Sequence, residues 1–292
     1  MSEKNRKKMM KLQDWHTHNS LCRHAIGSLE DYVKKAIEIN LNIIGFSDHF
    51  PYEYLEGVEE IPIDEYGMRL NEIESYLSTA EKLKDKYRSQ LDIKIGFEID
   101  YIENQIDRLN THLNKIKSRL DYILGSIHVL YSEDGPWAMD DHRFLEQYNS
   151  LGSKNVFLQY YSTLQKMIKT KEFDFDIISH FDLPKKFNKL PSKDSKDLIA
   201  NKVSKLLDLV KKRDLVVEIN TAGFRKEVRE QYPSKDIIKN MYELDIPILL
   251  SSDAHEPNEL AYEFKKVIQL LKDLGYNQLA TFNKRKRTFI EI

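Results

Sequence analysis

The stretch Leu12-Gln13-Asp14-Trp15-His16-Thr17-His18 decides the fold, because it predicts a short β-strand that runs directly into two histidines. In an extended segment, residues i and i+2 point to the same side, so both imidazoles can face one metal ion. Strands that end in reactive side chains recur along the chain, and both the fold and the function can be predicted from that recurrence.

Short apolar runs alternate with amphipathic helical stretches over the whole chain. The predicted strands are Leu12–His16, Asn42–Ser47, Ile93–Ile99, Tyr122–His128, Asp176–His180, Leu215–Asn220 and Ile246–Ser251, while a last run, Thr288–Ile292, is expected to close or flank the sheet. Such alternation implies a parallel sheet covered by helices, and seven or eight units favour a barrel. We expect one α/β barrel domain over residues 1–292, with residues 1–10 as a flexible N-terminal extension.

Helical signals lie between the predicted strands. Ser28-Leu29-Glu30-Asp31 has the form of a capping box, and apolar residues at helical spacing follow it through Ile39. Apolar residues at steps of three and four predict further helices, with stripes at Ile102, Ile106, Leu109, Leu113 and Ile116, at Leu198, Val203, Leu206 and Val210, and at Phe264, Val267 and Leu271.

The composition is that of an ordinary globular protein, with 41% hydrophobic and 32% charged residues among 292. A net charge of −2 argues against a nucleic-acid partner, and the basic run Lys284–Arg287 is expected to be a solvated turn between two short strands. No apolar segment predicts a membrane span or a secretion signal. Cys22 is the single cysteine, so no internal disulfide can form, and we expect a cytoplasmic location.

Most of the nine histidines fall at the ends of predicted strands. This placement is shared by His16, His18, His49, His128, His180 and His255 and by the acids Glu98 and Asp253, while His24 lies in the loop after the first strand. The C-terminal strand ends of an α/β barrel lie on one face, where active sites are built. Imidazole and carboxylate ligands suit zinc, iron or manganese, and Glu98 can bridge two ions.

Two histidines are expected to lie outside this group. His112 falls inside an amphipathic helix, and His142 lies in a polar loop beside Asp140 and Asp141. A single His-x-His or Asp-x-His motif arises often by chance. The joint placement at successive strand ends does not, so a multinuclear metal site is predicted.

These motifs resemble, in order, those of the PHP (polymerase and histidinol phosphatase) superfamily. The resemblance rests on His16-Thr17-His18, Ser47-Asp48-His49, Gly96-Phe97-Glu98, Gly125-Ser126-Ile127-His128, Ser179-His180 and Ser252-Asp253-Ala254-His255. It implies a distorted (β/α)7 TIM-like barrel with a trinuclear metal site at the C-terminal ends of the strands.

The segment from His16 to Ala25 is also similar to the first motif of bacterial PHP-type histidinol-phosphate phosphatases, in which His24 replaces an aspartate. Further likeness to that subfamily is carried by Gly96–Tyr101, Asp121–Val129, Phe175–Asp182, Glu218–Lys226 and Tyr232-Pro233-Ser234. The similarity runs from about Leu12 to near the C-terminus. Small departures are Ser179, Phe181 and Phe224.

The resemblance implies nine metal ligands, which are His16, His18, His24, His49, Glu98, His128, His180, Asp253 and His255. One ion would take His16, His18, Glu98 and Asp253, a second Glu98, His128 and His180, and a third His24, His49 and His255. Three divalent ions are expected, with zinc first and iron or manganese as alternatives. A hydroxide bridging two ions would attack phosphorus in line.

Three residues are assigned catalytic roles, namely Glu98 as bridge, Asp253 as a candidate proton donor to the leaving group, and Arg225 as a phosphate ligand. The guanidinium of Arg225 can bind phosphate oxygens bidentately. Loop candidates for reading the rest of the substrate are Asp100, Tyr101, Trp137, Asp140 and Asp141.

The predicted activity is hydrolysis of L-histidinol phosphate to L-histidinol and phosphate, with a small-molecule ester as the partner and the oligomeric state open. The alternative is a PHP phosphoesterase or exonuclease that acts on another ester. A non-catalytic metal-binding protein would have lost ligands, and all nine positions are filled. An amidohydrolase would usually have a bridging lysine at a central strand end, and none is found there.

Overall fold

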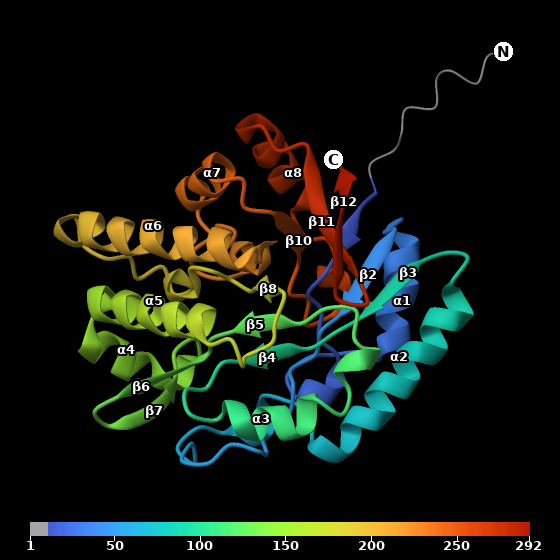
Figure 1. Cartoon of the computed structure of the whole chain (residues 1–292), viewed down its shortest axis with the longest axis horizontal. Helices are drawn as coiled ribbons and strands as arrows, with labels where there is room; N and C mark the ends of the chain where they lie inside the picture. The colour runs from blue at the N-terminus through green and yellow to red at the C-terminus, as the bar shows by residue number, and fades with distance from the viewer. Residues whose placement is uncertain (1–10) are drawn as a thin grey trace.

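Parallel strands form the centre of the computed structural model, which describes residues 11–292 (Figure 1). One sheet has the order β1-β2-β3, with the bounds Gln13–Asp14, Ile43–Phe46 and Asp92–Ile95. The other has the order β10-β9-β8-β5-β4, with the bounds Ile248–Ser251, Val216–Asn220, Ile177–Ile178, Leu124–Ser126 and Glu98–Asp100. The flexible extension predicted for residues 1–10 lies outside the described residues.

Hydrogen bonds at both edges join the two sheets into a distorted barrel. On one side, the Trp15 amide donates to the Leu250 carbonyl over 3.2 Å, and Thr17 forms a parallel bridge with Ala254. On the other side, His49 forms a parallel bridge with Glu98. The barrel that was predicted from strand–helix alternation therefore runs continuously from β1 around to β10.

The single strand predicted over Ile93–Ile99 is wrong in detail, because the chain forms β3 and β4 with a break at Gly96-Phe97. The Gly96 amide still donates to the Phe46 carbonyl over 2.7 Å, but regular pairing with β2 ends there. A Cβ atom at Gly96 would lie 2.7 Å from the Tyr122 carbonyl oxygen. The break therefore needs a residue without a side chain.

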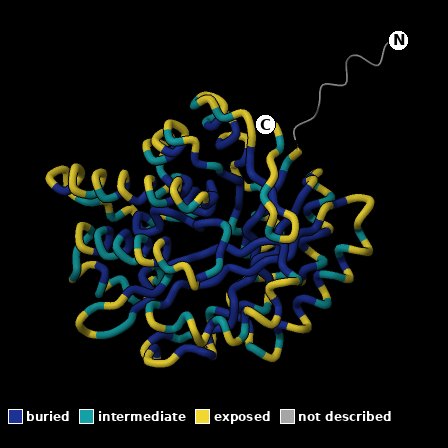
Figure 2. Tube along the Cα trace, in the orientation of Figure 1, coloured by how far each residue is buried: buried dark blue, intermediate teal, exposed yellow. Residues whose placement is uncertain are grey.

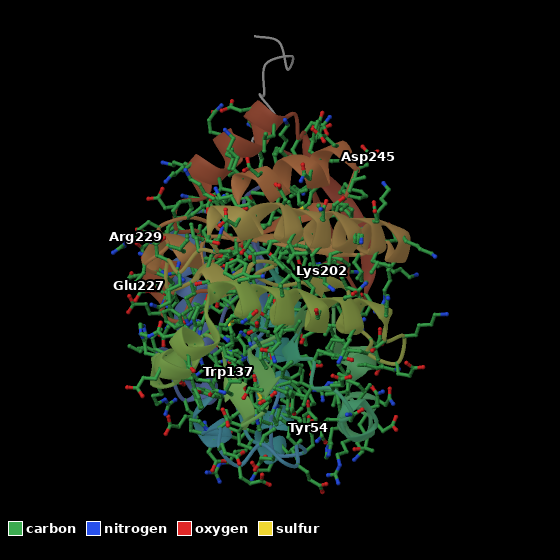
Figure 3. The ribbon with its side chains drawn as sticks, turned by 90° about the vertical axis from the view of Figure 1, so that its left-hand side faces the viewer. Tyr54, Trp137, Lys202, Glu227, Arg229 and Asp245 are labelled. Carbon is green, nitrogen blue, oxygen red and sulfur yellow. The ribbon has the colours of Figure 1, made fainter. Side chains whose placement is uncertain are left out.

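Helices surround the barrel, as the alternation predicted (Figure 1). Their bounds are α1 Leu29–Glu38, α2 Ile73–Tyr87, α3 Ile106–Leu113, α4 Leu145–Leu151, α5 Ser153–Lys169, α6 Lys196–Arg213, α7 Lys235–Glu243 and α8 Phe264–Leu274. The capping box at the start of α1 is confirmed, with Ser28 and Asp31 bonded reciprocally. Figure 2 shows the buried strands at the centre and the exposed outer faces of the helices. Lys202 on α6, labelled in Figure 3, reaches Gln165 on α5 over 3.0 Å.

The chain ends in an antiparallel hairpin of β11 (Gln278–Asn283) and β12 (Lys286–Glu291), which flanks the barrel. Phe282 of this hairpin packs edge-on against Trp15, in a cluster of buried residues from the beginnings of the strands. The turn at Lys284–Arg287 does join two strands, but it is not simply solvated. Arg285 forms ion pairs with Asp174 and Asp176, so this basic run is partly neutralised by the barrel.

A second hairpin spans Val129 to Ala138, where the sequence predicted no strand. Its strands are β6 (Val129–Ser132) and β7 (Gly135–Ala138), and Trp137 on β7 is labelled in Figure 3. Among the described residues, no helix combines the length and the apolar character needed to cross a membrane.

Gly45→Ala should destabilise the barrel. The new Cβ would lie 2.9 Å from Tyr122 Cζ and 3.1 Å from Trp15 Cα. Tyr122 cannot easily move, because its hydroxyl donates to the Trp15 carbonyl over 2.7 Å. Overpacking of this kind costs about 1–3 kcal/mol in the free energy of unfolding, which urea denaturation measures. The double variant with Tyr122→Phe should lose less than the sum of the single changes. Strict additivity would show that the clash lies elsewhere.

Candidate metal centre

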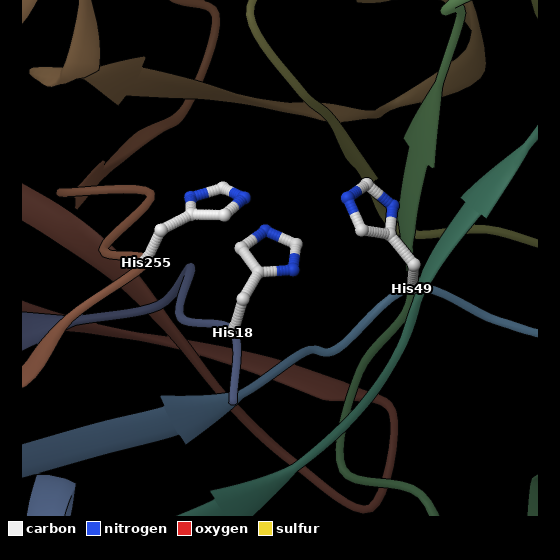
Figure 4. A group of neighbouring side chains, drawn as sticks. All are labelled: His18, His49 and His255. Atoms are coloured by element: carbon white, nitrogen blue, oxygen red, sulfur yellow. The ribbon is translucent and has the colours of Figure 1, made fainter. Parts of the chain in front are cut away.

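The nine side chains predicted as ligands all come from segments at the C-terminal ends of barrel strands. His16 and His18 follow β1, His49 follows β2, Glu98 follows β3 and is the first residue of β4, His128 follows β5, His180 follows β8, Asp253 and His255 follow β10, and His24 lies in the loop after β1. Figure 4 shows the rings of His18, His49 and His255 gathered from three of these segments.

The segment His16–His18 lies alongside Asp253–His255. The His18 amide donates to the Ala254 carbonyl over 2.9 Å, and the Ala254 amide donates to the His16 carbonyl over 3.3 Å. Because side chains alternate in extended backbone, His16 and His18 point to the same side. The Thr17 hydroxyl donates in another direction, to the Gly45 carbonyl. This pairing explains why both motifs have one intervening residue.

Glu98 is the centre of the cluster and is 2% exposed, so its charge depends on neighbouring groups rather than on water. Its Oε2 lies 3.2 Å from His16 Nε2, 3.5 Å from His18 Nε2 and 3.1 Å from His49 Nδ1, and its Oε1 lies 3.0 Å from His180 Nε2 and 3.7 Å from His128 Nε2. The Ser126 hydroxyl also donates to Oε1 over 2.6 Å. One carboxylate thus faces five imidazoles.

Asp253 is the second acid of the cluster. Its Oδ1 lies 3.2 Å from His18 Nε2, 3.5 Å from His255 Nδ1 and 3.8 Å from His16 Nε2. Its backbone has φ 52°, a left-handed conformation that costs energy for a residue with a side chain. That conformation turns the chain so that Asp253 and His255 both face the cluster.

His24 joins the cluster from the loop after β1. Its Nδ1 lies 2.9 Å from the Cys22 carbonyl and 3.0 Å from the Glu65 carbonyl, so this nitrogen serves as the donor. The ring lies 4.9 Å from the His255 ring and 5.3 Å from the His49 ring, between centroids. The other ring nitrogen of His24 is therefore left to face its neighbours.

The cluster has the properties of a metal site. His16 Nε2, His18 Nε2 and His49 Nδ1 are buried without a hydrogen-bond partner, and each is the nitrogen that faces Glu98. Buried polar atoms without partners are costly, and a cation would satisfy all three together with the carboxylate. Several groups have ligand atoms within 4.8 Å of one another, among them His16, His18 and Asp253, and His49, Glu98 and His128. Imidazole and carboxylate donors fit zinc, iron or manganese.

Three further acids contact the ring nitrogens that do not face Glu98. Glu218 Oε2 lies 3.0 Å from His16 Nδ1, Asp100 Oδ1 lies 2.7 Å from His128 Nδ1, and Asp48 Oδ1 lies 3.4 Å from His18 Nδ1. Such partners orient the rings and raise their basicity as ligands. Sequence reasoning gave no role to Glu218 or Asp48. Asp100 was expected to read the substrate from a loop, but it lies buried on β4, where it lines the cavity at the cluster and also accepts a bond from the Tyr52 hydroxyl.

A signal for two of these acids was present in the sequence. Asp100 stands two residues after Glu98 in the same extended run, so the two carboxylates share a side. Glu218 interrupts the apolar strand Val216–Asn220, where a charge needs a buried partner.

Neighbouring charges outweigh burial in setting the pKa values of His16 and Glu98, while burial dominates at His49 and His255. Burial alone would lower the pKa of His16, but the charges of Glu98, Glu218 and Asp253 outweigh it and raise that pKa well above its usual value. Burial would raise the pKa of Glu98, but His16, His49 and His128 hold it well below its usual range. Burial lowers the pKa of His49 and that of His255 well below the ordinary value. Protons therefore bind where a divalent ion would compete with them.

A cavity of about 540 Å³ opens onto the cluster, a size suited to a small organic ligand. Its lining includes five residues of the cluster and the two lysines Lys186 and Lys226, and the five are Glu98, His128, His180, Asp253 and His255. Asp140, one of the predicted loop acids, lines the cavity and is paired with Lys186 over 2.9 Å.

The rim of the cavity is a polar cluster of Glu65, Tyr66, Asp141 and Arg143. Arg143 binds Glu65 over 2.7 Å and Asp141 over 2.8 Å, and the Tyr66 hydroxyl donates to Asp141. His142 also lines the rim, 3.6 Å from Glu227, a residue labelled in Figure 3.

Two of the expected substrate-reading residues are not at the cavity. Tyr101 and Trp137 are buried, with exposures of 4% and 0%, and neither belongs to its lining. The Tyr101 hydroxyl bonds Thr170 instead. Both side chains are packed in the core, so the prediction for them is wrong. His112 is outside the metal cluster, as expected, with its ring near Tyr54.

Arg225 lies beside the centre but is not part of the cavity lining. It donates to the carbonyls of Ser252 and Asp253, each over 2.9 Å, and pairs with Glu259. This arrangement supports the backbone that carries Asp253. The prediction that Arg225 binds phosphate directly gains no support from this geometry.

The PHP domain family model matches residues 14–222, and the chain therefore belongs to the PHP family. It is 31% identical over 278 residues to a probable histidinol-phosphatase of Deinococcus radiodurans, covering 95% of this chain and 99% of that protein. It is 26% identical over 267 residues to the histidinol-phosphatase of Bacillus subtilis, covering 89% and 99%.

Among solved structures, the chain is similar to the histidinol phosphate phosphatase of Lactococcus lactis, which was solved with zinc, L-histidinol and phosphate. The TM-score is 0.75 at 20% identity, covering 95% of this chain and 99% of that one. The fold predicted from the resemblance, a distorted TIM-like barrel, is confirmed.

Zinc should stabilise the metal-free protein. An ion that binds only the folded state adds about 2.7 kcal/mol when its concentration is 100 times the dissociation constant. Differential scanning fluorimetry should therefore show a rise in melting temperature that a chelator reverses. His16→Ala should reduce the rise, while His112→Ala on α3 should leave it intact. An equal rise in all three proteins would place the ion outside this cluster.

Proposed function

We propose that this chain is a metal-dependent phosphomonoesterase that hydrolyses L-histidinol phosphate to L-histidinol and phosphate. The observation that carries the proposal is the cluster around Glu98, which opens into a cavity with two lysines on its wall. The named relatives of similar length support the choice of substrate. No observation on the described residues favours another ester or a nucleic acid, and a cytoplasmic location stays a prediction.

We infer that the nine side chains hold three divalent ions, with zinc as the first candidate. His16, His18 and Asp253 would hold one ion together with Glu98, and His128 and His180 would share Glu98 in a second. His24 and His255 would belong to the third. His49 was predicted there as well, and its Nδ1 is also 3.1 Å from Glu98. When bound, such ions would acidify water and neutralise charge on the phosphate.

The residues of the chain itself orient the ester. Lys186 and Lys226 offer positive charge to the phosphate in the cavity that residues of the cluster also line. Asp253 and His255 are the side chains of the β10 segment that reach the cavity, with exposures of 17% and 32%. We infer that the proton for the leaving alkoxide is held at this edge of the cluster, with Asp253 Oδ as the candidate position.

The rim fits the remainder of the substrate. Histidinol has an ammonium group and an imidazole, which require acidic and aromatic partners. Asp141, Glu65 and Tyr66 supply both kinds of group at the rim of the cavity. Asp140 and Asp141 therefore stay as candidates for reading the amine, while Tyr101 and Trp137 do not.

A panel of phosphomonoesters tests the proposed activity. The zinc-loaded protein should release phosphate from L-histidinol phosphate with a kcat/KM about a hundredfold or more above that for p-nitrophenyl phosphate, because the rim binds only the former. His16→Ala should remove this activity, and His112→Ala should retain it. Turnover restricted to nucleotides or nucleic acids would refute the assignment.

Lys186→Met and Arg225→Met separate phosphate binding from support of the cluster. Lys186→Met should weaken inhibition by inorganic phosphate about tenfold or more, since a bond to a charged group contributes about 1.5–3 kcal/mol. Arg225→Met should instead lower zinc affinity, measured by calorimetry, because the carbonyl of Asp253 loses its donor. If Arg225→Met weakened phosphate binding at unchanged zinc affinity, the direct role predicted from the sequence would be right.

A further inference from the structure

Glu218 is a fully buried acid in the middle of β9, with 0% exposure. Four groups from four segments converge on its carboxylate. Oε1 accepts from the His180 amide over 2.7 Å and from Asn220 Nδ2 over 2.8 Å, while Oε2 accepts from the Ser251 hydroxyl over 2.6 Å and lies 3.0 Å from His16 Nδ1. The acid therefore links the ends of β8, β9 and β10 to the segment after β1.

The chemistry of these partners determines where the His16 proton resides. An ionised carboxylate only accepts hydrogen bonds, so His16 Nδ1 must carry a proton to bond with it. When the ring is neutral, as a metal ligand must be, its lone pair is then on Nε2. That nitrogen is buried, lacks a hydrogen-bond partner and lies 3.2 Å from Glu98 Oε2.

His180 is held by the same acid through its backbone. Its amide bonds Glu218 Oε1, and its Nε2 lies 3.0 Å from Glu98 Oε1. One buried carboxylate thus orients two imidazoles, of which His16 faces Oε2 of Glu98 and His180 faces Oε1. Its Oε2 acts on the ring of His16, and its Oε1 acts on the chain at His180.

We propose that Glu218 is a positioning residue that fixes His16 as the Nδ1–H tautomer, so that Nε2 is available to a metal ion. The proposal rests on the proposed function only in that the cluster binds a divalent ion. It needs no particular ester as substrate.

The amide isostere has a predictable arrangement. In Glu218→Gln, the amide nitrogen cannot face the His180 amide, because both would be donors. The carboxamide oxygen must therefore take the place of Oε1, and the NH₂ group must face Ser251 and His16. A donor at that position bonds an unprotonated Nδ1, which moves the ring proton to Nε2 and removes the lone pair that a metal needs.

Zinc calorimetry and ¹⁵N NMR of the zinc-loaded full chain test this proposal. Wild-type protein should show His16 with a protonated Nδ1, and Glu218→Gln should show the opposite tautomer, with the His16 signals assigned by their loss in His16→Ala. Zinc affinity should fall about ten- to a hundredfold, the usual cost of losing such a partner. In the His16→Ala background, Glu218→Gln should cost much less, because its main target is already gone.

Asp121→Asn is the matched control. Asp121 is also a fully buried acid and accepts from the amides of Ile95 and Lys284, near the terminal hairpin at the other end of the barrel. The Asp121→Asn variant should have a lower melting temperature but an unchanged zinc affinity and an unchanged His16 tautomer. A purely structural role of Glu218 would make the two variants behave alike.

Three results would overturn the proposal. These are an unchanged His16 tautomer in Glu218→Gln, an unchanged zinc affinity, or an equal loss of affinity with and without His16. If Glu218→Gln does not fold, Glu218→Asp replaces it, because its shorter side chain weakens the bond to His16 Nδ1 and should lower zinc affinity only when His16 is present. Failure of the proposed function would instead appear as normal zinc binding without hydrolysis of histidinol phosphate.

Discussion

The pairing of the segment His16–His18 with Asp253–His255 is the constraint on which the rest of the molecule depends. These hydrogen bonds join the first barrel strand to the last, so they close the barrel. They also bring the four outer side chains of these segments to the cluster, through extended backbone in the first segment and through the left-handed conformation of Asp253 in the second. The same hydrogen bonds therefore close the fold and bring together cluster residues that are far apart in sequence.

The barrel divides its interior between two kinds of packing. At the end covered by the terminal hairpin, Trp15, Tyr122 and Phe282 form an apolar plug. At the other end, histidines and acids occupy the buried space. Apolar burial at one end stabilises the fold, whereas buried polar groups without partners at the other end cost free energy unless a cation binds them. The bond from the Tyr122 hydroxyl to the Trp15 carbonyl lies where the two regions meet.

The ligands could be predicted from the sequence because each follows a recognisable strand, and strand ends of a barrel share one face. The acids behind them were harder to find. Glu218 stands among apolar neighbours in β9, and its bond to His16, 202 residues away in sequence, is seen only in the folded structure. The role of Arg225 was predicted in part from what a guanidinium can bind, and that chemistry does not show that its Nη2 donates to two backbone carbonyls. The break between β3 and β4 depends on the nearby Tyr122, a contact that no local pattern encodes.

His24 connects the centre to the mouth of the cavity. The carbonyl that holds its Nδ1 belongs to Glu65, whose side chain is bonded to Arg143 in the rim. The peptide segment that meets an incoming molecule is therefore the one that orients a candidate ligand. Under the proposed function, a change of backbone at Glu65 that reshaped the rim would also move the carbonyl that orients His24.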